Sequence, residues 1–255
     1  HSLLLVGVAF LVFSMAASTV YLIYDLADLE KDRNHPEKKH RPLASGALPV
    51  WAGVVGAIVF GICSIGIGFY TNTAFGIILA AYLINNLAYS FKLKNVVILD
   101  AMSLALGFVF RVLAGAWIIN VPASQWLIMC TLLLALFLGF SKRRHEITLL
   151  ADDANNHRKV LEHYSAYLLD QMIIIVAAAT VVSYALYTAA ETTIEKFGTH
   201  ALIYTVPFVL YGIFRYLYLV HQKESGGNPT RVFLTDWPTL LNVGLWIFVS
   251  VSIIY

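Results

Sequence analysis

The chain has 255 residues, of which 59% are hydrophobic and 13% are charged, and its formal net charge is +2. Ordinary soluble domains are about 45–50% apolar and about 25% charged. This composition excludes an ordinary soluble domain, because part of any globule must face water. It predicts a protein that lies in a membrane. The two cysteines, Cys63 and Cys130, have no spacing typical of a disulfide framework or a metal site.

Eight segments are long and apolar enough to cross a membrane, which takes about 20 mostly apolar residues. In chain order they cover residues 2–24, 47–70, 74–91, 98–119, 124–141, 164–188, 200–220 and 238–255. We therefore predict an all-α fold, a polytopic bundle of transmembrane helices with eight spans visible in this sequence.

The connectors between these segments alternate in charge. All 17 lysines and arginines except Arg111, Lys196 and Arg215 lie in the connectors 25–46, 92–97, 142–163 and 221–237. Cytoplasmic connectors carry the excess of Lys and Arg in membrane proteins. We therefore predict that these four connectors face the cytoplasm and carry the chemistry of the protein.

The first of these connectors begins with three regularly spaced acids, Asp25, Asp28 and Asp32. If the first helix continues past the membrane surface, spacings of three and four residues place the carboxylates on one face. Three like charges repel one another unless a cation lies between them, and Mg²⁺ binds through one or two carboxylates plus substrate phosphates. Basic residues suited to phosphate oxygens follow, among them Arg33, Lys38 and Arg41. A solvated loop at the membrane interface is the alternative interpretation.

The next two charged connectors carry further candidates. Tyr89 and Lys92 stand at the end of the third predicted span, where an aromatic residue and a lysine are also typical of interfacial anchors. The connector 142–163 is rich in basic residues, and it places Lys142, Arg143 and Glu146 at positions i, i+1 and i+4. Arg158 lies later in this connector, and Tyr164 comes directly after it.

One arginine lies inside a predicted span. Asp100, Ser103, Gly107 and Arg111 follow one another at steps of three and four residues, which places them on one face of the helix predicted for 98–119. Charged side chains within a membrane usually face the interior of a bundle or a water-filled cavity. Arg111 is therefore either a functional residue or half of a structural ion pair.

The acidic connector resembles a known family. Asp25-x2-Asp28-x3-Asp32, followed by Arg-Pro-Leu-Ala-Ser-Gly over 41–46, is similar to the first signature of the UbiA superfamily of intramembrane prenyltransferases. The finer pattern Asp-Arg-x-His-Pro-x-Lys-x2-Arg-Pro over 32–42 resembles the branch that transfers phosphoribosyl groups to decaprenyl phosphate. The connector 142–163 lacks the second Asp-x3-Asp motif of prenyltransferases and is basic, as in that branch. One departure is Tyr24, where the family usually has asparagine, a better ligand for a hard cation.

The resemblance implies a fold, a reaction and a set of roles. It implies one membrane domain over 1–255, nine helices in the whole protein with one outside this sequence, and a multi-pass location in the cell inner (plasma) membrane. The reaction would move a 5-phosphoribosyl group from 5-phosphoribosyl diphosphate to a polyprenyl (decaprenyl) phosphate with Mg²⁺. The implied partners are these two substrates and the membrane, and no nucleic acid is expected. A homo-oligomer is possible.

The implied site residues fall into three groups. Catalytic and metal-binding carboxylates would be Asp25, Asp28 and Asp32. Phosphate ligands would be Arg33, Lys38, Arg41, Lys92, Lys142, Arg143 and Arg158. The substrate, including its ribose, would be positioned by Tyr89, Tyr164 and the catalytic candidate Glu146.

Two other functions stay open from the sequence. The first keeps the fold and moves a prenyl group from its diphosphate to an aromatic acceptor, although the missing second Asp-x3-Asp motif counts against it. The second is a transporter whose charged connectors only follow the membrane topology. Transporters often have broken helices in matched halves, and the sequence has no such pair.

Overall fold

The structure, a computed structural model, describes residues 2–34, 38–150, 159–222 and 234–255. Helices account for all regular structure in these ranges. The chain forms two compact units, His1–Ser124 and Gln125–Tyr255. Arg158 and most of the predicted connector 221–237 lie outside the described residues.

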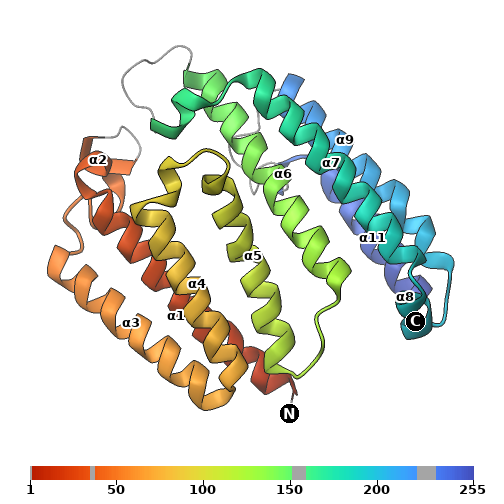
Figure 1. Cartoon of the computed structure of the whole chain (residues 1–255), viewed down its shortest axis with the longest axis horizontal. Coiled ribbons are helices and arrows are strands. Elements are labelled where there is room, and N and C mark those ends of the chain that lie inside the picture. Colours follow the sequence, from red (N-terminus) through yellow and green to blue (C-terminus); the bar gives the residue numbers. More distant parts are fainter. Residues whose placement is uncertain (1, 35–37, 151–158, 223–233) are drawn as a thin grey trace. The chain divides into compact units, whose positions relative to one another are not determined.

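Among its described residues, the first unit has four long helices and three short ones. In chain order these are α1 (Ser2–Ala27), α2 (Leu29–Asn34), η1 (Lys38–His40), α3 (Val50–Thr71), α4 (Thr73–Phe91), η2 (Leu93–Asn95) and α5 (Leu99–Ile118). Successive long helices run in opposite directions (Figure 1). The C-terminal ends of α1 and α4 therefore lie at the same end of the unit as the N-terminal ends of α3 and α5. We call this the charged end, because the predicted connectors 25–46 and 92–97 lie there.

The core of the first unit joins α1, α4 and α5. Small residues on α1, such as Ala9 and Ala16, allow the larger side chains Phe75 and Leu79 of α4 to approach closely. The link from α3 to α4 is a single residue, Asn72, whose side-chain oxygen accepts hydrogen bonds from two N–H groups in the first turn of α4. This tight link fixes α3 beside α4.

Among its described residues, the second unit contains four long helices with three short ones. These are α6 (Gln125–Leu150), η3 (Lys159–His163), α7 (Ala166–Ala189), α8 (Glu191–Phe197), η4 (Ala201–Thr205), α9 (Val206–Gln222) and α11 (Trp237–Ile254). Partly buried polar groups join α7, η4 and α11: Trp246 donates to the Tyr184 hydroxyl at 2.9 Å, and Tyr184 shares a hydrogen bond of 2.7 Å with Thr205.

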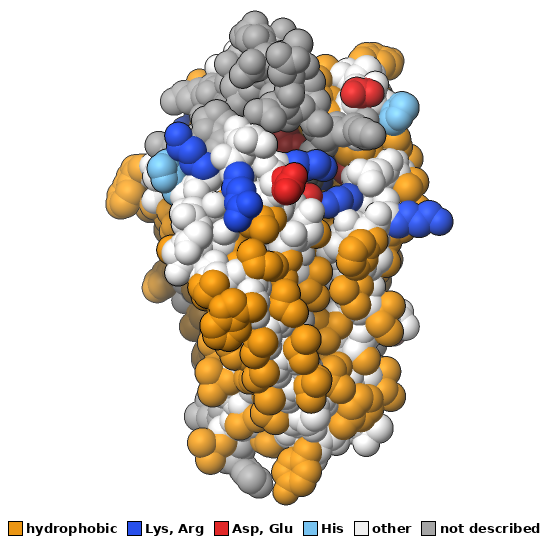
Figure 2. Space-filling model, turned by 90° about the vertical axis from the view of Figure 1, so that its left-hand side faces the viewer, with side chains coloured by type: hydrophobic (Ala, Val, Ile, Leu, Met, Phe, Trp, Pro, Cys, Tyr) orange, Lys and Arg blue, Asp and Glu red, His pale blue; other side chains and the backbone are white. Residues whose placement is uncertain are grey.

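The eight predicted spans are confirmed. Eight of the described helices are long and apolar enough to cross a membrane, from Leu4–Ala27 to Trp237–Ile254. Figure 2 shows the corresponding segregation on one face, where charged side chains gather toward one end and hydrophobic side chains cover most of the rest.

The largest difference from the predicted boundaries is at the end of the fifth span. The fifth span was predicted to end at 141, with a connector from 142, but α6 continues to Leu150. The residues after 141 include good helix formers such as lysine, arginine and glutamate, and Arg143 forms an ion pair with Glu146 at spacing i, i+3. These features extend the helix beyond its apolar part.

Candidate functional site

The three predicted acids lie on nearly continuous helix. α1 ends at Ala27 and α2 begins at Leu29, yet the helical hydrogen bonds continue across the break, from Asp28 N to Tyr24 O at 2.9 Å and from Asp32 N to Asp28 O at 2.8 Å. The expectation that the first helix continues through these residues is therefore confirmed in hydrogen bonding. Asp32 is buried, with 4% of its surface exposed, whereas Asp28 is partly open.

Arg41 lies between two of these carboxylates. Its Nη1 atom donates to Asp25 Oδ1 and to Asp32 Oδ2, both at 2.8 Å. Two carboxylates this close repel each other unless a cation neutralises them. One nitrogen atom of Arg41 therefore occupies the position between Asp25 and Asp32 where a small cation would also be bound favourably.

The loop that carries Arg41 is held by packing against α3. Leu43 is buried, and its side chain lies against Gly53 of α3, where an added Cβ would stand 2.8 Å from a Leu43 methyl group. Backbone hydrogen bonds from Arg41 N to Lys38 O and from Leu48 N to Pro42 O close the loop. A glycine on α3 thus makes room for the anchor that positions Arg41.

The second charged connector meets the first. Lys94, in η2, forms an ion pair of 3.1 Å with Asp28, which lies 66 residues earlier in the chain. Lys92, the lysine predicted from the sequence, is exposed at the end of α4. The connector was predicted correctly but Lys94 was not, because only the turn through η2 decides which lysine reaches the acids.

The backbone that follows Lys94 is strained. Ile98 has a φ of 71° directly before α5. This conformation is a genuine outlier for a β-branched residue, and such strain clusters at functional sites. It lets the chain turn sharply from η2 into α5, whose second residue, Asp100, is fully buried.

Tyr24, at the position where the resemblance leads us to expect asparagine, links α1 to α4. Its hydroxyl donates to Asn86 Oδ1 at 2.8 Å, and its ring lies 5.7 Å from the ring of Tyr89. Tyr89 is itself buried. The phenol therefore has a structural role, and it supplies no neutral amide oxygen beside Asp25.

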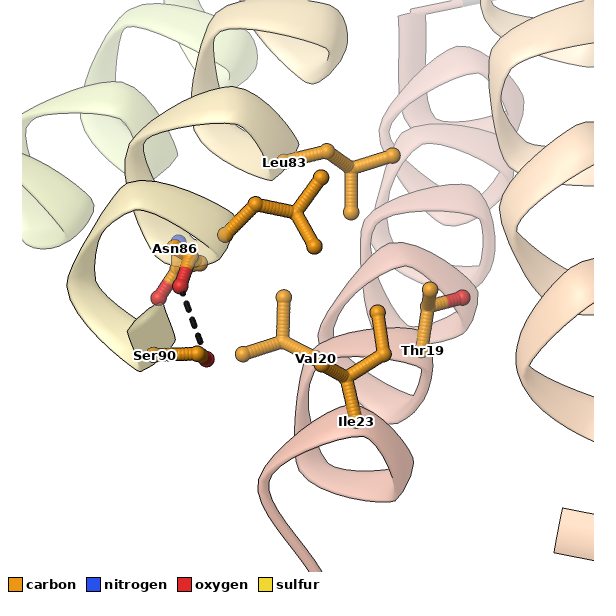
Figure 3. A pocket seen from close by; sticks show the side chains of 7 residues that line it. Thr19, Val20, Ile23, Leu83, Asn86 and Ser90 are labelled. Atoms are coloured by element: carbon orange, nitrogen blue, oxygen red, sulfur yellow. Dashed lines mark hydrogen bonds between the residues drawn. The ribbon is translucent and has the colours of Figure 1, made fainter. Parts of the chain in front are cut away.

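A small cavity lies inward from these residues, between α1 and α4. Thr19, Val20 and Ile23 of α1 line it together with Leu83, Asn86 and Ser90 of α4 (Figure 3). The Ser90 hydroxyl donates to the backbone carbonyl oxygen of Asn86 at 3.0 Å. The cavity has a volume of about 60 Å³, well below the ~300 Å³ at which small-molecule sites begin, so it cannot hold a sugar diphosphate alone.

The donor set at Asp25 and Asp32 fits a magnesium ion. Mg²⁺ is bound in proteins by one or two carboxylates together with substrate phosphates and water. The described part of the chain contains no group of three or more His, Cys, Asp or Glu side chains arranged around a common metal position. Asp25 and Asp32 share one partner, while Asp28 pairs elsewhere with Lys94, so the structure brings two of the three predicted ligands together.

The other predicted basic residues of the first unit lie on the short helices beside the acids. Arg33 is exposed on α2, and Lys38 is partly buried in η1. Both therefore belong to the charged end, where the predicted phosphate contacts would form.

In the second unit, three predicted residues lie on α6. Lys142 is exposed, whereas Arg143 is 3% exposed and its Nη1 atom donates to Glu146 Oε2 at 3.0 Å. Tyr164 is buried just after η3. Lys142 and Arg143 thus face different surroundings, as expected for adjacent residues on a helix.

A cluster of charges in the same unit was not predicted. Asp170 Oδ1 accepts a hydrogen bond from Arg144 Nε at 2.9 Å and contacts His221 Nε2 at 3.1 Å. The sequence did contain a signal for this cluster, because Asp170 lies one turn into an apolar helix and a charge in that position needs a partner.

A second ion pair of that unit joins α9 to α11. Arg215 donates through two nitrogens to Asp236, at 3.0 and 2.7 Å, in a bidentate arrangement. Asp236 also caps α11 by accepting from Thr239 N. The hydrogen bonds from Arg215, and then those from Thr239, hold the pKa of Asp236 well below its usual value.

The fold, the converging acids and the basic loops define a class, an integral-membrane transferase of the UbiA type. The chain belongs to the UbiA prenyltransferase family, whose family model matches residues 1–249. The UbiA resemblance is thereby confirmed, and membership of a family of transferases disfavours the transporter alternative.

Curated relatives and solved structures agree with this assignment. The decaprenyl-phosphate phosphoribosyltransferase of Mycolicibacterium smegmatis is 33% identical over 91% of this chain and 74% of its own length. That of Corynebacterium glutamicum is 33% identical over 98% of this chain and 76% of its own length. The structure of a UbiA homolog from Archaeoglobus fulgidus bound to GPP and Mg²⁺ matches with a TM-score of 0.75 and 18% identity, covering 98% of this chain and 87% of that one. This last likeness shows the fold.

Proposed function

We propose that the protein transfers a 5-phosphoribosyl group from 5-phosphoribosyl diphosphate to polyprenyl phosphate, with decaprenyl phosphate as the expected acceptor. The observation that carries the proposal is the position of one Arg41 nitrogen between Asp25 and Asp32, with Lys94 on Asp28 beside them. Carboxylates that converge on one basic side chain, with a second basic side chain close by, are suited to binding a metal ion together with a diphosphate. The names of the relatives at 33% identity support the phosphoribosyl donor.

Asp25 and Asp32 would hold Mg²⁺, with Asp28 as the third predicted acid. When bound, the ion neutralises negative charge on the departing diphosphate. Arg41 and Lys94 then turn from the carboxylates to phosphate oxygens of the donor. Guanidinium and ammonium groups stabilise the charge that develops on the leaving group, and Arg33, Lys38 and Lys92 are predicted to add to this field.

The reaction needs no general base at the acceptor. A lipid phosphate oxygen, already anionic, forms a bond to C1 of the ribose, while the bond from C1 to the diphosphate oxygen breaks and its electron pair leaves with the diphosphate. The protein therefore acts by holding the two reactants in place and by stabilising negative charge. Tyr89 is predicted to help position the ribose.

The remaining assignments are predictions from the sequence. They are substrate binding by Lys142, Arg143, Arg158 and Tyr164, a catalytic role for Glu146, and the organisation of 1–255 as one domain. The charge distribution supports a location in the inner (plasma) membrane with the four basic connectors in the cytoplasm.

A transfer assay tests the proposed function. Purified protein with Mg²⁺, labelled 5-phosphoribosyl diphosphate and decaprenyl phosphate should give a labelled lipid, and Asp28→Asn should abolish this product. A labelled product from prenyl diphosphate and an aromatic acid instead would establish the prenyltransferase alternative. Full activity of the Asp28→Asn variant would remove Asp28 from the site.

A further inference from the structure

The first unit contains a second and larger cavity, toward the end of its helices opposite the charged end. It has a volume of about 350 Å³, which lies within the range of small-molecule sites. The first four turns of α1, the first turn of α4 and the last turns of α5 line it. Its lining is hydrocarbon apart from Ser14 and Arg111, and includes Phe10, Phe13, Phe75 and Gly115.

Arg111 is the only charged group in this lining, and the described residues of the first unit supply it with no ion-pair partner. Its Nη2 atom lies 3.4 Å from the Tyr82 hydroxyl. Its guanidinium carbon lies 5.0 Å from the ring centre of Phe108 and 6.0 Å from that of Phe13. Aromatic faces attract a cation but do not neutralise it. The ion pair considered from the sequence is therefore absent among the described residues of the first unit.

The position of Arg111 makes an uncompensated charge costly. It lies twelve residues after Leu99, or about 18 Å along α5, so it is near the middle of a hydrocarbon layer about 30 Å thick. Helical side chains lean toward the N-terminus, and the guanidinium indeed lies by Phe108, almost one turn earlier. The side chain thus turns away from the nearer end of its helix.

From this arrangement we infer that the cavity binds an anionic amphiphile, a phosphate attached to a hydrocarbon chain. The phosphate pairs with the guanidinium of Arg111, a geometry that arginine favours, and the chain lies against the apolar lining. Arg111 and Phe10 are exposed on the first unit, and this leaves the cavity of that unit open to such a ligand. The site lies well inside the membrane from the aspartates, and it does not depend on the proposed transfer reaction.

Titration with dodecyl phosphate tests this inference. The purified full chain in a non-ionic detergent is titrated with dodecyl phosphate, dodecanol and inorganic phosphate, and heat release gives the affinities. We expect dodecyl phosphate to bind at least about tenfold more tightly than the other two, and Arg111→Met to remove about tenfold or more of this affinity. Equal binding of dodecanol, or an unchanged affinity in Arg111→Met, would overturn the site.

Three further variants distinguish binding in this cavity from binding at the aspartates. A Cβ at Gly115 meets no atom within 4 Å, so Gly115→Leu should fold, fill the cavity and weaken binding by about tenfold while Arg111 stays in place. Gly66→Leu on α3 also enters open space but lies outside the cavity, and should bind as the wild type does. Arg41→Gln should also leave the affinity unchanged. A loss in Arg41→Gln with none in Gly115→Leu would place the phosphate at the aspartates and refute the inference.

Native mass spectrometry identifies the natural ligand. Protein released from its membrane should carry the mass of one phospholipid or one polyprenyl phosphate, and Arg111→Met should lose it. Equal retention of that lipid by the variant would contradict the inference.

Discussion

Arg41 forms ion pairs with both Asp25 and Asp32 through one nitrogen atom, so it competes with any metal ion that arrives without a diphosphate. A diphosphate removes this competition, because it offers Arg41 another anion. The metal ion and the diphosphate should therefore bind together more tightly than either binds alone.

Arg41→Gln tests this competition. In the absence of diphosphate the variant should bind Mn²⁺ on the order of tenfold more tightly than the wild type, because the carboxylates lose their internal cation. In the presence of pyrophosphate, the wild type should instead bind Mn²⁺ more tightly than the variant. Paramagnetic resonance of free Mn²⁺ measures both affinities, and Lys31→Gln, an exposed change on α2, serves as the control. Weaker Mn²⁺ binding by Arg41→Gln in both conditions would contradict the competition.

The lowered pKa of Asp236 predicts how the stability of the fold depends on pH. A carboxyl group with a folded pKa below its ordinary value of 3.8 stabilises the fold above that value, and loses this contribution as the pH falls toward the folded pKa. Melting temperatures of the wild type and Asp236→Asn should therefore differ by a constant amount from about pH 8 to about pH 5. The difference should shrink only below about pH 4. A difference that already fades between about pH 7 and about pH 5 would be inconsistent with the Arg215 pairing.

At the scale of elements, α3 positions the active-site loop through the contact of Gly53 with Leu43. Gly53→Leu should cost about 1–3 kcal/mol in the free energy of unfolding by overpacking. It should also weaken diphosphate binding, because Leu43 anchors the loop of Arg41. Gly66→Leu is the matched control on the same helix, since its side chain enters open space. Equal diphosphate binding by the two variants would show that the anchor does not position Arg41.

The elements also show where sequence reasoning was sufficient and where it was not. The length of the apolar segments predicted all eight spans, because the thickness of the membrane sets how many apolar residues a spanning helix needs. The end of α6 was predicted too early, since an apolar segment marks the hydrocarbon layer and not the end of the helix. The pair formed by Asp28 and Lys94 joins residues 66 positions apart, and no local pattern distinguishes Lys94 from Lys92.

At the scale of the whole molecule, the positive-inside rule predicts which connectors face the cytoplasm. Single cysteines are placed at Lys39 and at Glu195, both exposed, after replacement of Cys63 and Cys130 by alanine. A membrane-impermeant maleimide should label position 195 in intact spheroplasts, and position 39 only after the membrane is permeabilised. The opposite pattern would invert the topology.

The acids themselves could be predicted from the sequence, because their spacing follows the helical repeat. Their partners depend on the tertiary fold, so the spacing alone did not predict that Arg41 lies between Asp25 and Asp32. The contacts of Asp170 with Arg144 and His221 likewise join three separate helices, so no local pattern could have predicted them.

Binding of 5-phosphoribosyl diphosphate, measured without any lipid acceptor, tests the central claim most directly. The wild type should bind the donor with Mg²⁺ and lose that binding in excess chelator. Asp32→Asn should weaken it by about tenfold or more, whereas Glu30→Gln, an exposed acid on α2, should leave it unchanged. Donor binding that survives both the chelator and Asp32→Asn would contradict a metal-diphosphate site at these acids.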